Sequence, residues 1–558
     1  MKLNKLINVV PLAVLILAVG SGCRKSQFNI NKNINNVTDS TVTYFVVMPA
    51  ALNNTSRIVA GRWGPIQNWM SYWSRSGTYA PNVTEETYQI TTGFGTAVWD
   101  QCYDNNYDYN IVRIKAATAG AGFYEGIARI MMAHNFQILV DVYGNVPYTQ
   151  ALKGSGNPTP AYDKGLDIYK ALLREIDAGM LLINNATVTA SNPNKDIATN
   201  DVMFQGDKTK WQKFGNTLKL RMLIHAYAVG AIDKTAEVAI INANGFGFLG
   251  VGENAMTNPG YTGNDKPNSF FNAYITNTDG SANANNTYYK ANEWGIEYYK
   301  YNVDPRVTTY PSYIGTVGGR FYLAGSGGLI GVPYGTPPIA TYSASVVAGI
   351  GPGLNKGATA PSLVMSSSES FFLQAEAKFR GWNVSASSPE ALMNLGVSEN
   401  MAYLGVPNAV ANAAIYLSLN APQPDAQYTA GPMFAGGPSG GLYTILSQKW
   451  FAMNGINTLE TWTDWRRVPY SSVATKLSPA LGNAAASTTN FTYGDVGFIG
   501  GAGSFGPGPF RSVAPQITPA DQIPVRYLYP QTEYNYNSAN VTAEGVITRY
   551  SRIFWDLN

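Results

Sequence analysis

The chain has 558 residues, of which 45% are hydrophobic and 13% are charged, and its formal net charge is +3. Charged residues have about half of their usual share of roughly 25%, which excludes a disordered polyelectrolyte and a coiled coil, because both depend on charge. A near-neutral chain without a block of Lys and Arg also does not suit nucleic-acid binding, which relies on neutralising phosphates. The surface must instead present neutral polar groups, since the chain contains 36 Tyr, 11 Trp and 56 Gly.

The N-terminus has the order of an export signal. Lys2 and Lys5 precede an apolar run at residues 6–19, and three small residues then lead directly to Cys23. The run is too short for a membrane span, and a Cys directly after small residues is typical of a bacterial lipoprotein. We therefore expect a signal peptide at 1–22, lipidation at Cys23, a flexible tether at 23–43 and one folded domain at 44–558. A plain secretory signal with an incidental Cys is the alternative.

Apolar residues recur at helical spacing in several parts of the folded domain, which is the main sequence signal of an amphipathic helix. These stretches are residues 126–143, 166–183, 209–229, 367–382, 389–404, 443–453 and 458–465. Between them lie long segments without periodicity, rich in Asn, Gly, Pro or aromatic residues, at 254–292, 315–359, 420–441 and 477–511. Long loops inside a domain are usually functional. The sequence therefore predicts a helical scaffold that carries elaborate loops.

Cys102, His134 and His225 are the residues that could indicate thiolate, metal or base chemistry. An exported chain with one remaining Cys has no disulfide framework. Cys102 lies in a predicted helix, where a small buried side chain is expected. Both His lie in amphipathic helices and lack the i, i+4 partner of a helix-borne zinc site. We therefore expect all three to be interior residues, and we expect no metal site and no cofactor.

Several short patterns match enzyme motifs without the context that those motifs need. Residues 437–441 fit G-x-S-x-G, but no His follows Ser439, as a hydrolase of that type requires. Stretches at 245–250 and 501–506 fit G-x-G-x-x-G, which a chain with 56 glycines matches by chance.

Paired carboxylates are the remaining enzymatic signal, because two acids suffice to cleave a glycosidic bond. The candidate pairs are Glu85 with Glu86, Glu293 with Glu297, and Glu369 with Glu376. Acids at such spacing usually form a solvated face or a salt bridge. We therefore expect no catalytic residues and no enzyme activity, with a surface glycosidase as the lower alternative.

The helical stretches and the segments that follow them carry a series of short sequence motifs in a fixed order, which we call phrases. The series consists of Ile130-Met-Met-Ala-His-Asn-Phe136, Asp141-Val-Tyr-Gly-Asn-Val-Pro-Tyr148, Tyr162-Asp163, Gly206-Asp207, Phe214-Gly-Asn-Thr-Leu-Lys-Leu-Arg221, Asp304-Pro-Arg306, Gln374-Ala-Glu-Ala-Lys-Phe-Arg-Gly381, Trp462-Thr-Asp-Trp-Arg-Arg467 and Ile523-Pro-Val-Arg-Tyr-Leu-Tyr-Pro530. Together these phrases resemble those of the SusD/RagB family, the nutrient-binding outer-membrane lipoproteins of Gram-negative bacteria. The resemblance covers most of the chain beyond the tether.

The resemblance implies a mostly α-helical fold, with tetratricopeptide-like helix pairs as the scaffold and long irregular loops as the ligand surface. It also implies a lipid-anchored outer-membrane protein that faces the cell exterior, captures an oligosaccharide and acts as the lid of a SusC-like TonB-dependent transporter. An oligopeptide ligand is the alternative within the same family. Relatives often carry acidic residues after the lipidated Cys, whereas this chain has Arg24 and Lys25.

Physical chemistry divides the aromatic and basic residues into scaffold and ligand surface. Lys210, Arg221, Arg380, Arg466 and Arg467 lie beside Trp and Phe, where each can pair with an acid while its stem covers apolar surface, so we interpret them as scaffold. A neutral glycan is instead held by aromatic ring faces and by polar groups at its rim. On this basis the predicted ligand-binding residues in the loops are Trp73, Arg75, Tyr79, Phe271, Tyr274, Tyr288 and Tyr289.

Overall fold

Helices make up most of the regular structure of this chain. The computed structural model describes residues 42–61, 63–421, 426–428, 440–468, 512–517 and 522–556. The longer helices in these ranges are α3 (Tyr44–Gly61), α6 (Thr96–Ala119), α7 (Gly122–Tyr143), α8 (Gly165–Asn185), α10 (Lys208–His225), α11 (Lys234–Ala243), α15 (Ser367–Phe379), α16 (Pro389–Tyr403), α17 (Ala409–Leu419), α18 (Gly440–Met453) and α19 (Thr458–Arg467). The predicted mostly α-helical fold is confirmed. Cys23, the signal peptide, Ser439 and the predicted loop at 477–511 lie outside the described residues.

Short elements connect these helices. The short helices are α4 (Gly64–Trp69), α5 (Val83–Glu86), α9 (Ile197–Asn200), α12 (Ser269–Tyr274), α13 (Asn285–Tyr288), α14 (Glu293–Tyr301), α22 (Gln531–Tyr536) and α23 (Ser538–Ala543), with 3-10 turns at Gly154–Gly156 and Ala340–Tyr342. Within the described ranges the strands form four antiparallel pairs: β1 (Trp73–Arg75) with β5 (Tyr289–Ala291), β2 (Val146–Pro147) with β3 (Tyr162–Asp163), β4 (Ala255–Thr257) with β8 (Ser362–Met365), and β6 (Tyr322–Leu323) with β7 (Gly349–Ile350). Three of these pairs fasten parts of the loops at 254–292 and 315–359.

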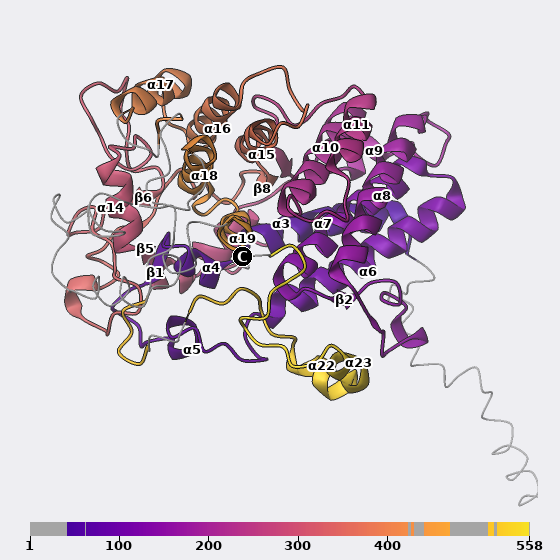
Figure 1. Cartoon of the computed structure of the whole chain (residues 1–558), viewed down its shortest axis with the longest axis horizontal. Helices are drawn as coiled ribbons and strands as arrows, with labels where there is room; N and C mark the ends of the chain where they lie inside the picture. The colour runs from indigo at the N-terminus through magenta and orange to yellow at the C-terminus, as the bar shows by residue number, and fades with distance from the viewer. Residues whose placement is uncertain are drawn as a thin grey trace, which may run out of the picture. The chain divides into compact units, whose positions relative to one another are not determined.

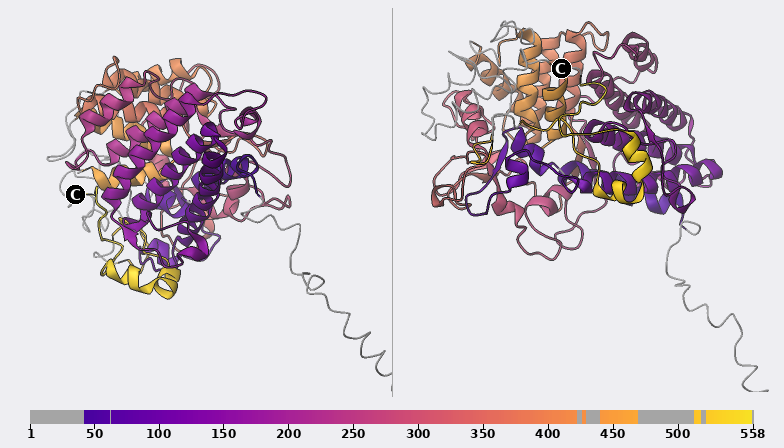
Figure 2. Two further views of the ribbon diagram at one scale, coloured as in Figure 1. Left: turned by 90° about the vertical axis from the view of Figure 1, so that its right-hand side faces the viewer. Right: turned by 60° about the horizontal axis from the view of Figure 1, so that its bottom comes forward.

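The helices pack in chain order. α3 packs on α6, α6 on α7, α7 on α8 and α8 on α10, and these helices lie together at the right of Figure 1. α10 then contacts α15, which packs with α16 and α18 above the centre of the same view. The β1–β5 pair and α14 lie at the opposite side from α8 in Figure 1, and the right-hand view of Figure 2 keeps this separation. No helix within the described ranges has the length and hydropathy that a membrane span needs.

Side-chain caps explain where several helices begin. Asp207 accepts a hydrogen bond from the backbone N–H of Lys210 at the start of α10, and Ser366 accepts one from Glu369 at the start of α15. Ser388 caps α16 in the same way and is followed by Pro389, whose fixed φ suits the first helical position. Each cap satisfies a backbone donor that the helix itself leaves open.

All seven helices predicted from periodicity are present. Four of the longer helices in the described ranges, α3, α6, α11 and α17, are not among those seven, and α6 and α17 show why. In α6 the buried positions include the amides of Asn105, Asn106 and Asn110, so the helix lacks the apolar periodicity that signals burial. In α17 the exposed positions include Val410, which is 76% exposed, so apolar residues occur all round the helix. In both cases polarity does not follow burial.

The close contact between α7 and α8 depends on a pair of glycines. A Cβ atom built on Gly126 would lie 2.5 Å from the carbonyl oxygen of Gly179, and a Cβ on Gly179 would lie 2.7 Å from the carbonyl oxygen of Gly126. Real Cβ atoms do not approach backbone so closely, and backbone cannot yield as a flexible side chain can. The two helices can therefore pack at this distance only with glycine at both positions.

A buried network of ion pairs joins the two halves of the helical scaffold. His225 on α10 contacts Asp141 on α7 through Nδ1 at 3.0 Å and Glu460 on α19 through Nε2 at 3.1 Å. Lys449 on α18 contacts the same Glu460 at 3.3 Å and Asp464 at 2.9 Å.

The network continues from Asp464 into α15. Arg467 binds Asp464 and Glu376 at 2.6 Å each, and the second arginine of the network, Arg221, binds Glu369. The predicted scaffold role is confirmed for Arg221 and Arg467. It is also confirmed for Arg380, which pairs with Glu376 at 2.7 Å, and for buried Arg466, whose guanidinium lies 3.7 Å from the ring centroid of Trp462. Lys210 is exposed, so that role is wrong for it.

Replacement of Gly126 by Ala tests the glycine contact. The added methyl group must push α7 away from α8, and overpacking of this kind typically costs about 1–3 kcal/mol. The matched control is Gly122→Ala in the same helix, where the nearest atom to the new Cβ would be at an ordinary 3.6 Å. Chemical unfolding should show a lower midpoint for Gly126→Ala and no loss for Gly122→Ala. Equal midpoints for the two variants would contradict the contact.

The pH dependence of stability tests the ion network. Burial alone lowers the pKa of His225, but the charges of Glu460 and Asp141 outweigh it and raise this pKa to about 9. Folding therefore favours protonated His225. The contribution of this protonation to the free energy of unfolding is full below the ordinary His pKa of about 6.5 and is lost as pH rises through about 9. The loss amounts to about 3 kcal/mol. Unfolding midpoints measured at pH 6.5 and pH 9 should differ less in His225→Gln than in the wild type.

His134 provides the matched control for that measurement. Burial lowers the pKa of His134 to about 3, so this residue does not titrate between pH 6.5 and pH 9. His134→Gln should keep the wild-type pH dependence over this range, whatever it does to stability itself. If His225→Gln also shows the wild-type pH dependence, the network does not hold His225 protonated.

Candidate ligand-binding surface

The β1–β5 pair brings together two loops that are far apart in sequence. Trp73 lies opposite Ala291, Ser74 opposite Lys290 and Arg75 opposite Tyr289. This pairing places the 73–79 segment against the segment that contains α12 and α13, the two regions from which the ligand-binding residues are predicted.

Aromatic rings from these two regions form a continuous series. Trp73 contacts Tyr274 edge to face at a centroid distance of 5.0 Å and Tyr289 at 5.5 Å. Tyr289 contacts Tyr288 at 4.9 Å, and Tyr288 contacts Tyr79 at 5.3 Å. Edge-to-face and tilted contacts at these distances stabilise aromatic pairs. Five of the seven predicted residues therefore lie in one aromatic series, which we call the tyrosine surface.

Arg75 holds the tyrosine surface in place from inside. Its Nε donates to Glu86 at 2.6 Å in a buried ion pair, and Nη1 donates to the carbonyl of Tyr79 at 2.6 Å. Nη2 donates to the carbonyl of Thr336 at 2.6 Å, which ties in the loop between β6 and β7. A planar guanidinium can satisfy several fixed acceptors at once. Arg75 is therefore a positioning residue for the 75–79 turn.

The predicted residues divide by exposure. Trp73, Arg75 and Tyr274 are 1%, 2% and 2% exposed, so in this structure they support the surface from beneath and do not face a ligand. Their predicted role is therefore corrected from direct ligand contact to support of the surface. Burial follows from their positions, since Trp73 and Arg75 lie on a strand whose three residues are all buried. The residues that remain half-exposed are Tyr79, Phe271, Tyr288 and Tyr289.

Phe270, and not Phe271, joins the aromatic series. Phe270 contacts Tyr274 at 4.9 Å and Trp73 at 6.5 Å, so it belongs to the aromatic series although it was not predicted. Helical spacing would have identified it, because Phe270 and Tyr274 are four residues apart and share a face of α12. Phe271, by contrast, has no ring contact within the described part of the chain.

The Tyr79 hydroxyl links the 73–79 segment to α13. It lies 2.5 Å from the hydroxyl of Thr287 on α13. The 76–78 turn beneath it is fixed by two further bonds, from Gly77 N–H to the Tyr342 carbonyl at 2.7 Å and from Ala344 N–H to the Thr78 hydroxyl at 2.9 Å. The half-exposed rings thus lie on a preformed backbone, which lowers the cost of ordering them around a ligand.

Five of the six candidate carboxylates, all except Glu293, have hydrogen-bond or ion-pair partners among the described residues. Glu86 pairs with Arg75, Glu297 with Lys300 at 2.6 Å, and Glu369 and Glu376 belong to the buried ion network. Burial raises the pKa of Glu85 to about 7, although the hydrogen bond from Asn68 acts to lower it. Burial and the nearby charge of Glu297 raise the pKa of Glu293 to about 7. The Glu85 carboxylate accepts hydrogen bonds from Asn68 at 2.6 Å and Asn82 at 3.2 Å. In this structure Glu85 and Glu86 fasten the base of the tyrosine surface.

The residues considered for metal or thiol chemistry lie inside the helical scaffold. Cys102 is buried in α6, and His134 and His225 are buried in α7 and α10, as expected. Among the described residues, no group of three His, Cys, Asp or Glu side chains could hold a metal ion.

Solved structures share this fold. A SusD/RagB family protein from Bacteroides thetaiotaomicron superposes with a TM-score of 0.63 at 18% identity, covering 92% of this chain and 99% of that one. A SusD homolog from Bacteroides fragilis gives 0.63 at 18% identity, with 92% and 99% covered. A chitin-binding SusD homolog from Flavobacterium johnsoniae gives 0.64 at 18% identity, with 91% and 98% covered. The comparison with curated proteins gives no match.

The family itself is identified by a sequence model. Residues 32–493 match the SusD-like model, whose description is "Starch-binding associating with outer membrane". The match spans most of the 558 residues, and it includes both the helical scaffold and the tyrosine surface. The chain therefore belongs to the SusD-like family, as its ordered phrases indicated.

Proposed function

We propose that this protein captures a neutral oligosaccharide outside the cell and passes it, unaltered, to a TonB-dependent outer-membrane transporter that it covers as a lid. The observation that carries the proposal is membership of a family described as starch-binding and associated with the outer membrane. The chitin-binding homolog from Flavobacterium johnsoniae, which shares the fold, supports a glycan as the ligand class.

The chemistry of the tyrosine surface supports a neutral ligand. Tyr79, Tyr288 and Tyr289 offer half-exposed rings, which suit the C–H faces of sugar rings. Arg75 is already neutralised by Glu86, so the surface presents no free positive charge from that residue. A tyrosine also gives rigid contact area at low conformational-entropy cost. The proposed direct contacts are therefore Tyr79, Phe271, Tyr288 and Tyr289, with Trp73, Arg75 and Tyr274 as their support.

The N-terminal sequence supports attachment to the outer membrane. Residues 1–22 have the order of a lipoprotein signal, and Cys23 is the residue that would be acylated. A lipid anchor followed by a tether at 23–43 lets the folded domain move on a membrane-embedded transporter without leaving it. We propose this arrangement, with the domain facing the cell exterior.

Tyrosine replacement tests the proposed ligand surface. Tyr79→Ala and Tyr288→Ala should each weaken binding of a neutral oligosaccharide by about 1 kcal/mol, or roughly fivefold in Kd, because each removes one ring face. The matched control is Tyr536→Ala, which removes a tyrosine that is 77% exposed on α22. Calorimetric titration against chitin and starch oligosaccharides should separate the variants from the control. Unchanged affinity in both variants would place the ligand elsewhere.

The same titrations test binding without turnover. After prolonged incubation with the wild-type protein, a labelled oligosaccharide should be recovered at its original length. Shortened products from a pure preparation would favour a glycosidase. Tight binding of an oligopeptide library in place of the oligosaccharides would favour the peptide-binding alternative.

Replacement of Cys23 tests the anchor. Cys23→Ala should abolish incorporation of labelled palmitate and release the protein from the membrane fraction, because a secreted chain without the thiol has no site for the lipid. Cys102→Ala is the matched control and should keep both the label and the membrane association, since Cys102 is buried in α6. Membrane association of Cys23→Ala equal to that of the wild type would contradict the lipoprotein proposal.

A further inference from the structure

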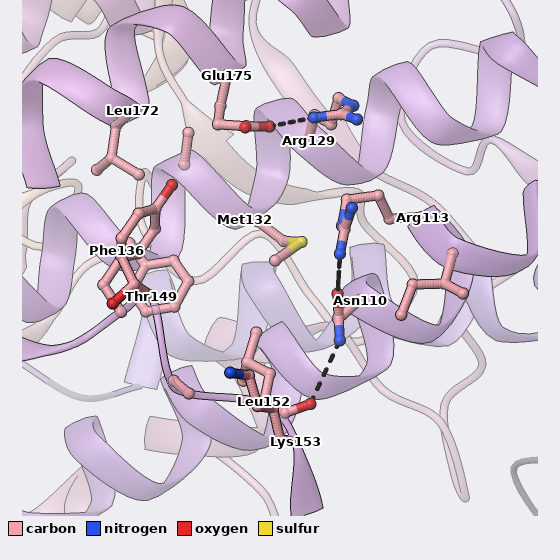
Figure 3. Close-up of a pocket in the computed structure, with 14 residues that line it drawn as sticks. Asn110, Arg113, Arg129, Met132, Phe136, Thr149, Leu152, Lys153, Leu172 and Glu175 are labelled. Carbon is pink, nitrogen blue, oxygen red and sulfur yellow. Dashed lines mark hydrogen bonds and ion pairs between the residues drawn. The ribbon is translucent and has the colours of Figure 1, made fainter. Parts of the chain in front are cut away.

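A groove with different chemistry lies among the first helices of the scaffold. It is bounded by α6, α7, α8 and the loop that follows β2, and its cavity volume is about 520 Å³. Figure 3 shows Met132 at its centre, Arg113 and Asn110 on one side and the Arg129–Glu175 pair at its upper edge. Ligand sites commonly have volumes of about 300–1,000 Å³. We call this cavity the α6–α8 groove.

The walls of the α6–α8 groove are fixed by hydrogen bonds. Asp163 on β3 accepts bonds from the backbone N–H groups of Tyr148 and Thr149, both at 2.9 Å. The Tyr103 hydroxyl on α6 donates to the Pro147 carbonyl at 2.7 Å, which ties the start of the same loop to the helix. Asn110 donates to the carbonyl of Leu152 at 3.4 Å. The groove is therefore formed before any ligand arrives, and binding need not order its loop.

The two arginines of the groove differ in their partners. Arg129 is neutralised by Glu125 at 2.8 Å and Glu175 at 2.6 Å. Arg113 bonds only the side-chain oxygen of Asn110, at 3.2 Å from Nε and 2.7 Å from Nη2. Within the described part of the chain, neither Arg113 nor Lys153 has a carboxylate at ion-pair distance. The lining thus carries two positive charges without acidic partners, Arg113 half-exposed and Lys153 exposed.

The apolar lining of the groove is mostly aliphatic, with Tyr148 as its half-exposed aromatic residue. Met132 and Leu152 are half-exposed, and Ile114 is 50% exposed, whereas the ring of Phe136 is buried. A Met thioether adapts its shape to varied apolar side chains. Sugar rings are instead held by flat aromatic faces, and the one half-exposed ring of this groove is that of Tyr148, whereas the tyrosine surface offers several. An aliphatic floor beside two unneutralised cations favours a ligand that carries apolar side chains and carboxylates together.

The chain does not supply such a ligand from its long undescribed segments. Residues 24–41 contain Arg24, Lys25 and Lys32 but only one acid, Asp39. Residues 469–511 contain Lys476 and Arg511 and again a single acid, Asp495. Both segments carry a net positive charge, which the groove would repel. The complementary segment must come from another polypeptide.

We infer that the α6–α8 groove docks an acidic segment of a partner protein, with an apolar side chain on Met132 and a carboxylate at Arg113 and Lys153. The segment is recognised by charge and by aliphatic contact, independently of the ligand on the tyrosine surface. Because the groove and the tyrosine surface are built from different elements, one can be altered without the other.

Selection from a library of displayed random ten-residue peptides tests this docking site. The wild-type protein should enrich peptides in which Asp or Glu flanks Leu, Ile, Met or Phe. A synthetic copy of the most enriched peptide should lose about tenfold or more in affinity for the Arg113→Glu, Lys153→Glu double variant, as measured by fluorescence anisotropy. Its affinity should also fall as salt is raised, since rim charges are screened.

Matched variants decide what a loss of affinity means. Lys170→Glu reverses an exposed charge on α8 outside the groove and should leave peptide affinity unchanged. Tyr79→Ala should also leave it unchanged, which separates failure of this proposal from failure of the proposed glycan site. Enrichment of peptides without acids, equal affinity in the double variant, or displacement of the peptide by an acidic oligosaccharide would each overturn the proposal.

Discussion

The buried ion network is the constraint on which the rest of the molecule depends. It joins Asp141 on α7, His225 on α10, Glu376 on α15, Lys449 on α18 and Arg467 on α19 into one connected set. Charges cost several kcal/mol each to bury, and the cost is recovered only when every member has its partners. The Trp555 indole also donates to Asp141 at 2.8 Å, so the C-terminal segment is fixed to the same set. The network therefore couples the packing of all the helices that supply its members.

This constraint explains why the family phrases are scaffold. The phrases around Asp141, Arg221, Glu376 and Arg467 supply members of the network, and those charges are unavailable to a ligand because each already has a partner. Binding chemistry must then come from residues outside the phrases. The loops provide it because short strand pairs and Arg75 fix them to the scaffold, so that irregular backbone still holds side chains in defined positions.

Two surfaces with opposite chemistry follow from the way these parts are assembled. The tyrosine surface consists of rings over a neutralised arginine and suits an uncharged ligand. The α6–α8 groove combines mostly aliphatic side chains with Arg113 and Lys153, which have no acidic partner among the described residues, and it suits an acidic ligand. A protein that captures one molecule while it stays attached to another needs surfaces that do not compete. The difference in charge lets the two surfaces bind different molecules. It costs little stability, because both surfaces lie outside the buried network.

The sequence by itself determined the helical scaffold and the family. Helical periodicity, the Ser and Asp caps and the ordered phrases are local signals, and local signals can be interpreted without knowledge of the fold. The scaffold role of Arg221 and Arg467 could be predicted for the same reason, since each lies beside aromatic residues in a helix.

Only the tertiary structure decided which aromatic residues are accessible. Trp73 and Tyr79 belong to one aromatic-rich segment. The pairing of β1 with β5 places Trp73 opposite Ala291 and buries it, whereas Tyr79 lies beyond the paired residues and stays half-exposed. The structure likewise decided that Arg129 is neutralised, whereas Arg113 has no acidic partner among the described residues. The position of an acid on a neighbouring helix depends on packing, and packing is a property of the whole chain.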